Sequence, residues 1–161
     1  MTPKTELRDF FACAAENAAR MFNTSDDHEV LPMWHAVNRS DEHIIIATPW
    51  SNDFEKNAVE HHLRKMFQAT GVKRLAFISE AWVATIHKPS AETLANPPRP
   101  SEHPDRREVL MISAENREGD SLSGFFYILR PEHGTPKLSP LHMNDYDQMS
   151  GRFTGMLGGV R

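Results

Sequence analysis

The sequence is poor in cysteine and has neither an excess of positive charge nor a long hydrophobic run. With Cys13 as the single cysteine among 161 residues, an intrachain disulfide is excluded. Lysine and arginine total 18 against 22 aspartates and glutamates, a net charge of −4, which disfavours binding of nucleic acid through its phosphates. No run approaches the roughly 18 apolar residues of a membrane span, and no apolar signal core follows the N-terminus. We therefore expect a cytoplasmic protein with no membrane partner.

What remains is the composition of an ordinary globular domain. Hydrophobic residues make up 39% of the chain and charged residues 25%, which excludes disorder, collagen and coiled coil for the chain as a whole. A chain of this length can bury a core without a disulfide or a metal. We predict a single domain over residues 1–161, with no internal repeat.

Two amphipathic helices are predicted, over residues 3–22 and 53–70. In each segment the apolar residues recur at three- and four-residue steps, which places them on one side of a helix. Thr2 can cap the first helix, while Asn52 and Glu55 have the spacing of a capping box at the start of the second.

Strand patterns follow the two helices. Alternating and β-branched residues predict strands over residues 33–37, 42–48, 74–87, 107–115 and 122–130. Pro32 has no N–H to donate, so the first strand should begin after it or lie at an edge. The order α-β-β-α-β-β-β predicts an α+β domain: a mixed or mostly antiparallel sheet of about five strands with two main helices.

Two segments lack these patterns. Residues 88–106 contain five of the eleven prolines, so we expect a long loop through which neither helix nor strand runs. The tail, residues 131–161, contains further prolines and glycines and is expected to be extended, with one short helix over residues 145–153.

The strand–loop–strand unit of residues 79–110 holds the first candidate site residues. Glu80 interrupts an apolar strand, and a buried carboxylate needs a partner, for which Arg106 and Arg107 are candidates. If its pKa were raised, Glu80 would be a candidate catalytic acid. Trp82 beside Arg106 and Arg107 is a candidate binding surface.

The same unit offers imidazole and carboxylate groups. His87 ends the predicted strand, and His103 and Asp105 lie where the loop returns to the next strand, so these three residues are candidate metal ligands. His103 and Asp105 are also candidate catalytic groups. The alternative is that they bond the loop to the strand ends. Neither His-Glu-x-x-His nor Cys-x-x-Cys occurs, and no pattern calls for a cofactor. We expect His62 at the edge of the core and Cys13 as a packed thiol.

The segment Gly119-Asp120-Ser121-Leu122 resembles the signature of the GDSL esterases and lipases, in which the serine is the nucleophile. That family carries the motif near its N-terminus and an Asp-x-x-His near its C-terminus. Here the motif falls in a predicted hairpin turn and no Asp-x-x-His occurs, so we interpret it as a turn.

A longer stretch, Ser79-Glu80-Ala81-Trp82 with residues 100–110, resembles small proteins of bacteria and their phages or prophages. The resemblance implies an accessory, phage-linked role and no particular activity, so it transfers no catalytic residue.

Three functions remain open. The favoured hypothesis is a non-catalytic binding or assembly module, acting on a protein partner or through self-association by strand pairing. The alternatives are a small metal-dependent or acid/base hydrolase that uses residues 79–110, and a weak nucleic-acid binder. No cluster of residues has the spacing that a reaction requires, which is why catalysis is not favoured.

Overall fold

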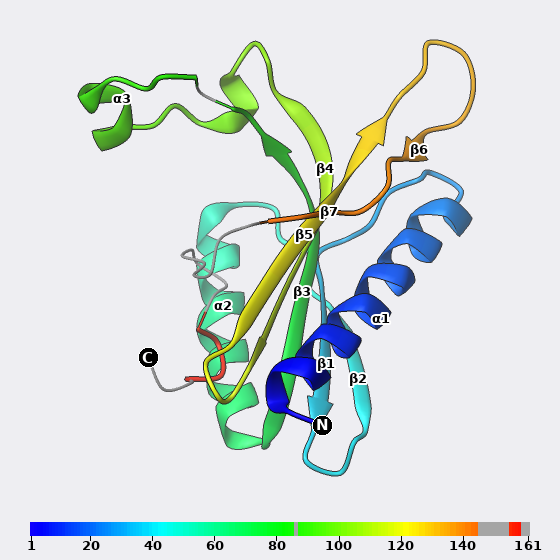
Figure 1. The fold of residues 1–161 in the computed structure, drawn as a ribbon, viewed down its shortest axis with the longest axis vertical. Helices are drawn as coiled ribbons and strands as arrows, with labels where there is room; N and C mark the ends of the chain where they lie inside the picture. The colour runs from blue at the N-terminus through cyan, green and yellow to red at the C-terminus, as the bar shows by residue number, and fades with distance from the viewer. Residues whose placement is uncertain (86, 145–154, 159–161) are drawn as a thin grey trace.

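The computed structural model describes residues 1–85, 87–144 and 155–158 and shows an antiparallel sheet with one long helix against each face (Figure 1). The elements are α1 (Pro3–Thr24), β1 (Met33–Asn38), β2 (His43–Ala47), α2 (Asp53–Ala69), β3 (Val72–Val83), α3 (Ala91–Ala95), η1 (Pro100–Glu102), β4 (Arg107–Asn116), β5 (Ser121–Leu129), β6 (Lys137–Leu138) and β7 (His142–Met143). The predicted α+β class and the two main helices are confirmed.

In the part of the chain that the structure describes, the sheet has seven strands instead of about five, because the tail adds two. Their order is β2-β1-β3-β4-β5-β6, with β7 also paired to β5, and every pair is antiparallel. Strand β1 begins directly after Pro32 and lies inside the sheet, which confirms the first of the two placements expected for it. The short β2 forms one edge.

Helix α1 covers one face of the sheet. Thr2 accepts a hydrogen bond from the N–H of Thr5, and Pro3 occupies the first turn, where it costs no hydrogen bond. One side of the helix is buried against β3, β4 and β5; its residues are Leu7, Phe10, Phe11, Ala14, Ala15, Ala18 and Phe22. Each large side chain buried in this way contributes about 1.5–3 kcal/mol.

Helix α2 lies on the opposite face and is less deeply packed. Only Leu63 and Phe67 of this helix are buried, against a second core cluster that contains Trp34 and Leu75. The apolar side predicted for this helix is only partly covered: Val59 and Met66 are half-buried against the same cluster, whereas Phe54 is exposed. His62 is exposed instead of lying at the core edge, since the side of α2 that packs on the sheet is centred on Leu63 and Phe67.

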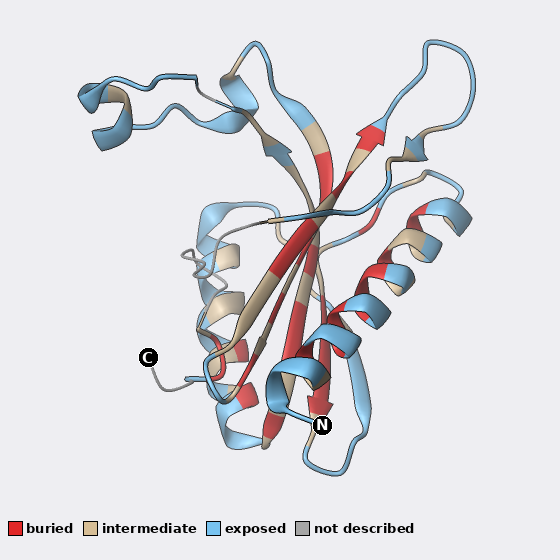
Figure 2. Ribbon diagram, in the orientation of Figure 1, coloured by how far each residue is buried: buried red, intermediate tan, exposed pale blue. Residues whose placement is uncertain are grey.

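Residues 84, 85 and 87–106 extend away from the body as a largely exposed arm between β3 and β4 (Figures 1 and 2). No helix or strand runs from end to end of residues 88–106, but two short helices form within them. Five residues between Pro89 and Pro97 form α3, capped by Ser90, and Pro100 opens the single turn of η1. Proline limits the length of these helices without preventing them.

The described part of the tail follows the outer edge of β5 as β6 and β7. Its last described turn packs Met156 and Leu157 into the α2-side core. The carboxylate of Glu115 accepts hydrogen bonds from the N–H groups of Gly155 and Leu157. The helix expected over residues 145–153 lies outside the described residues.

Candidate functional site

The predicted binding residues of the strand–loop–strand unit contact different aromatic rings. The guanidinium of Arg106 lies 5.1 Å from the ring centre of Trp82, whereas that of Arg107 lies 3.6 Å from the ring centre of Tyr127. Trp82 shares a face with Ile78, on the α1 side, while Arg107 pairs with Val83, which points to the other face. The two arginines therefore do not form one basic patch.

Glu80 has a partner other than the two arginines that the sequence offered. Its Oε1 accepts a hydrogen bond of 3.0 Å from the N–H of Val30, 50 residues away in the chain. Burial raises the pKa of the Glu80 carboxyl, opposed by the Val30 hydrogen bond and increased again by the nearby charge of Glu29. The carboxyl thus fastens the segment before β1 to the sheet.

Of the two histidines in the arm, His103 makes local hydrogen bonds and His87 is exposed. His103 accepts a hydrogen bond at Nδ1 from the N–H of Asp105, and its carbonyl accepts one from Arg106. His87 is exposed near the start of the arm. Within residues 1–85, 87–144 and 155–158, no group of three His, Cys, Asp or Glu side chains is placed to hold a metal ion.

Gly119 and Asp120 of the GDSL-like segment lie in the turn between β4 and β5, and Ser121 and Leu122 begin β5. Gly119 has φ +91°, a conformation that glycine adopts without strain. The buried side chain of Asn116 accepts a hydrogen bond from the N–H of Asp120 and donates one to the Asp120 carboxylate. These contacts account for the glycine and the aspartate by turn geometry.

The feature that sequence reasoning did not locate is the free edge of β2. No described strand pairs with its outer side. Ile44 and Ile45 have 41% and 57% of their surface exposed, although β-branched residues in strands are usually covered on one face. The run Ile44-Ile45-Ile46 does predict a strand, but its place at the edge depends on the order of strands in the sheet.

The pairing of β2 with β1 shows which of its backbone groups are free. Asn38 bonds to the carbonyl of Glu42, and Thr48 donates to the carbonyl of Pro32, at opposite ends of the ladder. Since hydrogen-bonded pairs alternate along an antiparallel ladder, the even-numbered residues of β2 bond to β1. The N–H and C=O groups of His43, Ile45 and Ala47 therefore point outward.

A pair of histidines lies between this edge and α1. His35 is 3% exposed, its ring contacts that of Phe10, and its Nε2 lies 2.8 Å from Nδ1 of His43. Among the described residues, Nδ1 of His35 has no hydrogen-bond partner. An unpaired acceptor costs less than an unpaired N–H, so we assign the Nε2–H tautomer, which donates to Nδ1 of His43. Burial, and then the charge of His43, lower the pKa of His35.

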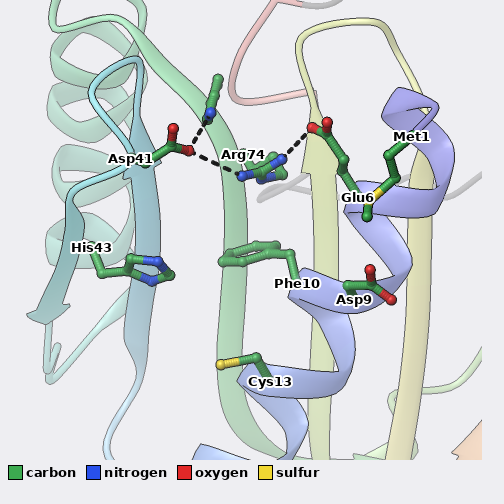
Figure 3. A pocket seen from close by; sticks show the side chains of 9 residues that line it. Met1, Glu6, Asp9, Phe10, Cys13, Asp41, His43 and Arg74 are labelled. Carbon is green, nitrogen blue, oxygen red and sulfur yellow. Dashed lines mark hydrogen bonds and ion pairs between the residues drawn. The ribbon is translucent and has the colours of Figure 1, made fainter.

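A cleft of about 360 Å³ opens beside His43, between α1 and the β1–β2 hairpin (Figure 3). Arg74 bonds to Glu6 on α1 at 2.6 Å and lies 3.6 Å from Asp41, which also pairs with Lys73. The contact with Lys73 lowers the pKa of Asp41. These carboxylates and cations neutralise one another, so the network braces the hairpin against the helix. Cys13 is exposed at this cleft, contrary to the packed thiol expected.

Comparison with known proteins finds no matching family model, no similar curated protein and no similar solved structure. Among the described helices, none is both long and apolar enough to cross a membrane. The function must therefore be argued from the geometry.

Proposed function

We propose that this protein is a non-catalytic binding and assembly module that accepts an extended strand along the free edge of β2. The observation that supports this most directly is the combination of outward backbone groups at His43, Ile45 and Ala47 with the exposed side chains of Ile44 and Ile45. An added strand would satisfy the backbone groups and cover the isoleucines, which is how extended segments bind sheet edges elsewhere.

The brace beneath the edge supports the same proposal. Binding by strand addition is stronger when the receiving strand is already ordered, since no conformational entropy is then lost on that side. The bonds of Arg74 to α1 and to the hairpin hold β2 in place. The link to phages and prophages remains a prediction, and an assembly role is compatible with it.

The test is binding of a labelled peptide that copies residues 42–48 and carries a solubilising lysine tail. Fluorescence anisotropy would measure its affinity, and backbone NMR would locate it. We expect binding, with the largest amide shifts at His43, Ile45 and Ala47. Shifts confined to other regions, or no binding, would contradict the proposal.

The sharpest variant is Ile45→Pro, with Ile45→Val as its control. Proline removes the N–H of residue 45, which points outward, and leaves the ladder with β1 intact. Ile45→Pro should therefore lose peptide binding while its unfolding transition stays cooperative, and Ile45→Val should bind as the wild type does.

A further inference from the structure

We infer that the strand that occupies the β2 edge is β2 of a second copy of this chain, paired antiparallel about a two-fold axis through Ile45. The inference rests on the proposed function and names its partner. It follows from the register of the edge, the distribution of charge along it, and the absence of the features that keep sheet edges apart.

The outward backbone groups are spaced symmetrically about Ile45. When two copies of β2 are placed antiparallel with Ile45 opposite Ile45, His43 of each lies opposite Ala47 of the other. All of these residues carry outward N–H and C=O groups, so each pair exchanges both hydrogen bonds. The edge is thus complementary to itself, as a two-fold interface requires.

The side chains also match in this register. Ile45 meets its own copy on the α1 face, and Ile44 meets Ile46 of the second copy on the α2 face. Cross-strand pairs of β-branched residues contribute roughly 0.2–1 kcal/mol each. Because the axis is perpendicular to the sheet, the two α1 helices lie on one face and the two α2 helices on the other.

Charge favours the antiparallel arrangement over a parallel one. Residues 43–48 contain no Asp, Glu, Lys or Arg, while Asp41 and Glu42 stand directly before the strand. A parallel pair would bring these acidic corners together, where like charges repel. An antiparallel pair keeps them at opposite ends of the shared ladder.

The edge carries none of the devices that normally prevent pairing between copies. Its five residues include no lysine and no proline, and the β1–β2 register runs without a bulge. Every other copy in solution presents the same edge. A five-residue strand spans only about 17 Å, and stable interfaces bury about 800 Å² per partner, so we expect a dimer that dissociates on dilution.

The first experiment measures molar mass against concentration by light scattering and sedimentation, for the wild type, Ile45→Glu and Leu129→Glu. Ile45→Glu places two carboxylates opposite each other on the axis. Leu129, also exposed, lies on the covered edge opposite Lys137, so its variant is the matched control. We expect the wild type and Leu129→Glu to shift from monomer to dimer, and Ile45→Glu to stay monomeric with an unchanged circular dichroism spectrum.

The second experiment tests the register by oxidation of single cysteines in a Cys13→Ser background. Ile45→Cys should form a disulfide-linked dimer, since opposed residues in a hydrogen-bonded pair lie about 5.5 Å apart. Ile44→Cys should not, because its partner in this register is Ile46 and two copies of residue 44 lie too far apart to bridge. Equal cross-linking of the two variants would overturn the register.

The outcomes separate this inference from the proposed function. A wild type that stays monomeric at every concentration but binds the residue 42–48 peptide overturns the second copy and leaves strand addition in place. A protein that neither dimerises nor binds the peptide overturns both. Dimerisation of Ile45→Glu equal to that of the wild type overturns the two-fold axis at β2.

Discussion

The two edges of the sheet differ in what covers them. Along β5, the described tail supplies β6 and β7. Between these strands, the N–H of Ser139 donates to the carbonyl of Tyr127, and the Ser139 hydroxyl accepts a hydrogen bond from the N–H of Tyr127. Asn144 then continues the contact through two bonds to Ser123. Along β2, no described residue plays this part. Within the described residues, the fold covers one edge from its own chain and leaves the other edge unpaired.

The two edges also differ in the residues that they carry. Gly124 lies where β7 crosses β5, and a Cβ there would come within 2.8 Å of the carbonyl oxygen of His142. The covered edge thus depends on a glycine for close approach, whereas the free edge carries isoleucines, which extend outward.

The largest expected effect on stability comes from a substitution that disrupts the covered edge. Gly124→Val would place its side chain against the His142 carbonyl and the ring of Phe11, so β7 must move away. We expect a loss of about 1–3 kcal/mol in the free energy of unfolding. Urea denaturation would measure it, and faster amide exchange at residues 142–144 would locate it. An unchanged midpoint would show that β7 does not need this contact, and Gly124→Ala should give an intermediate loss.

A smaller effect concerns how the free energy of unfolding depends on pH through His35, which lies on β1 next to the edge strand. The lowered pKa of His35 means that the folded state binds its proton less readily than the unfolded chain, whose imidazole titrates near 6.5. Stability should therefore fall as the pH drops below about 6.5. In His35→Gln, denaturation curves from pH 7.5 to 5.5 should show a shallower fall. A slope equal to that of the wild type would contradict the assigned burial of a neutral imidazole.

Glu115, which anchors the tail, should make stability depend on pH in the opposite direction. Burial raises the pKa of Glu115 above its usual 4.5, so the folded state keeps this proton longer than the unfolded chain does. Its contribution to stability is complete below about pH 4.5 and is lost as the pH rises through the higher folded value. Glu115→Gln should reduce this slope in denaturation curves. Glu80 shifts in the same direction, so part of the slope should remain.

The smallest expected effect on stability belongs to the free edge itself. Ile45 is exposed, so Ile45→Glu should change the unfolding free energy of the monomer by about 0.5 kcal/mol or less. The same substitution should abolish association. If thermal unfolding of dilute protein showed a loss as large as that of Gly124→Val, Ile45 would be part of the core and not of an interface.

Several details follow from local sequence alone. The caps at Thr2 and Asn52, the buried side of α1 and the start of β1 after Pro32 were all predicted, because each depends on residues within one or two helical turns. The partner of Glu80 was not, since Val30 is 50 residues away and offers only a backbone N–H, which every residue but proline carries.

The same distinction applies to the candidate interaction edge. Periodicity and β-branching establish that residues 43–47 form a strand, because side chains alternate along any extended chain. Whether that strand lies inside the sheet or at its edge depends on β1 pairing with β3, and on the tail strands β6 and β7 pairing with β5 instead of β2. Those contacts join residues far apart in the chain, and only the packed structure leaves Ile45 facing solvent.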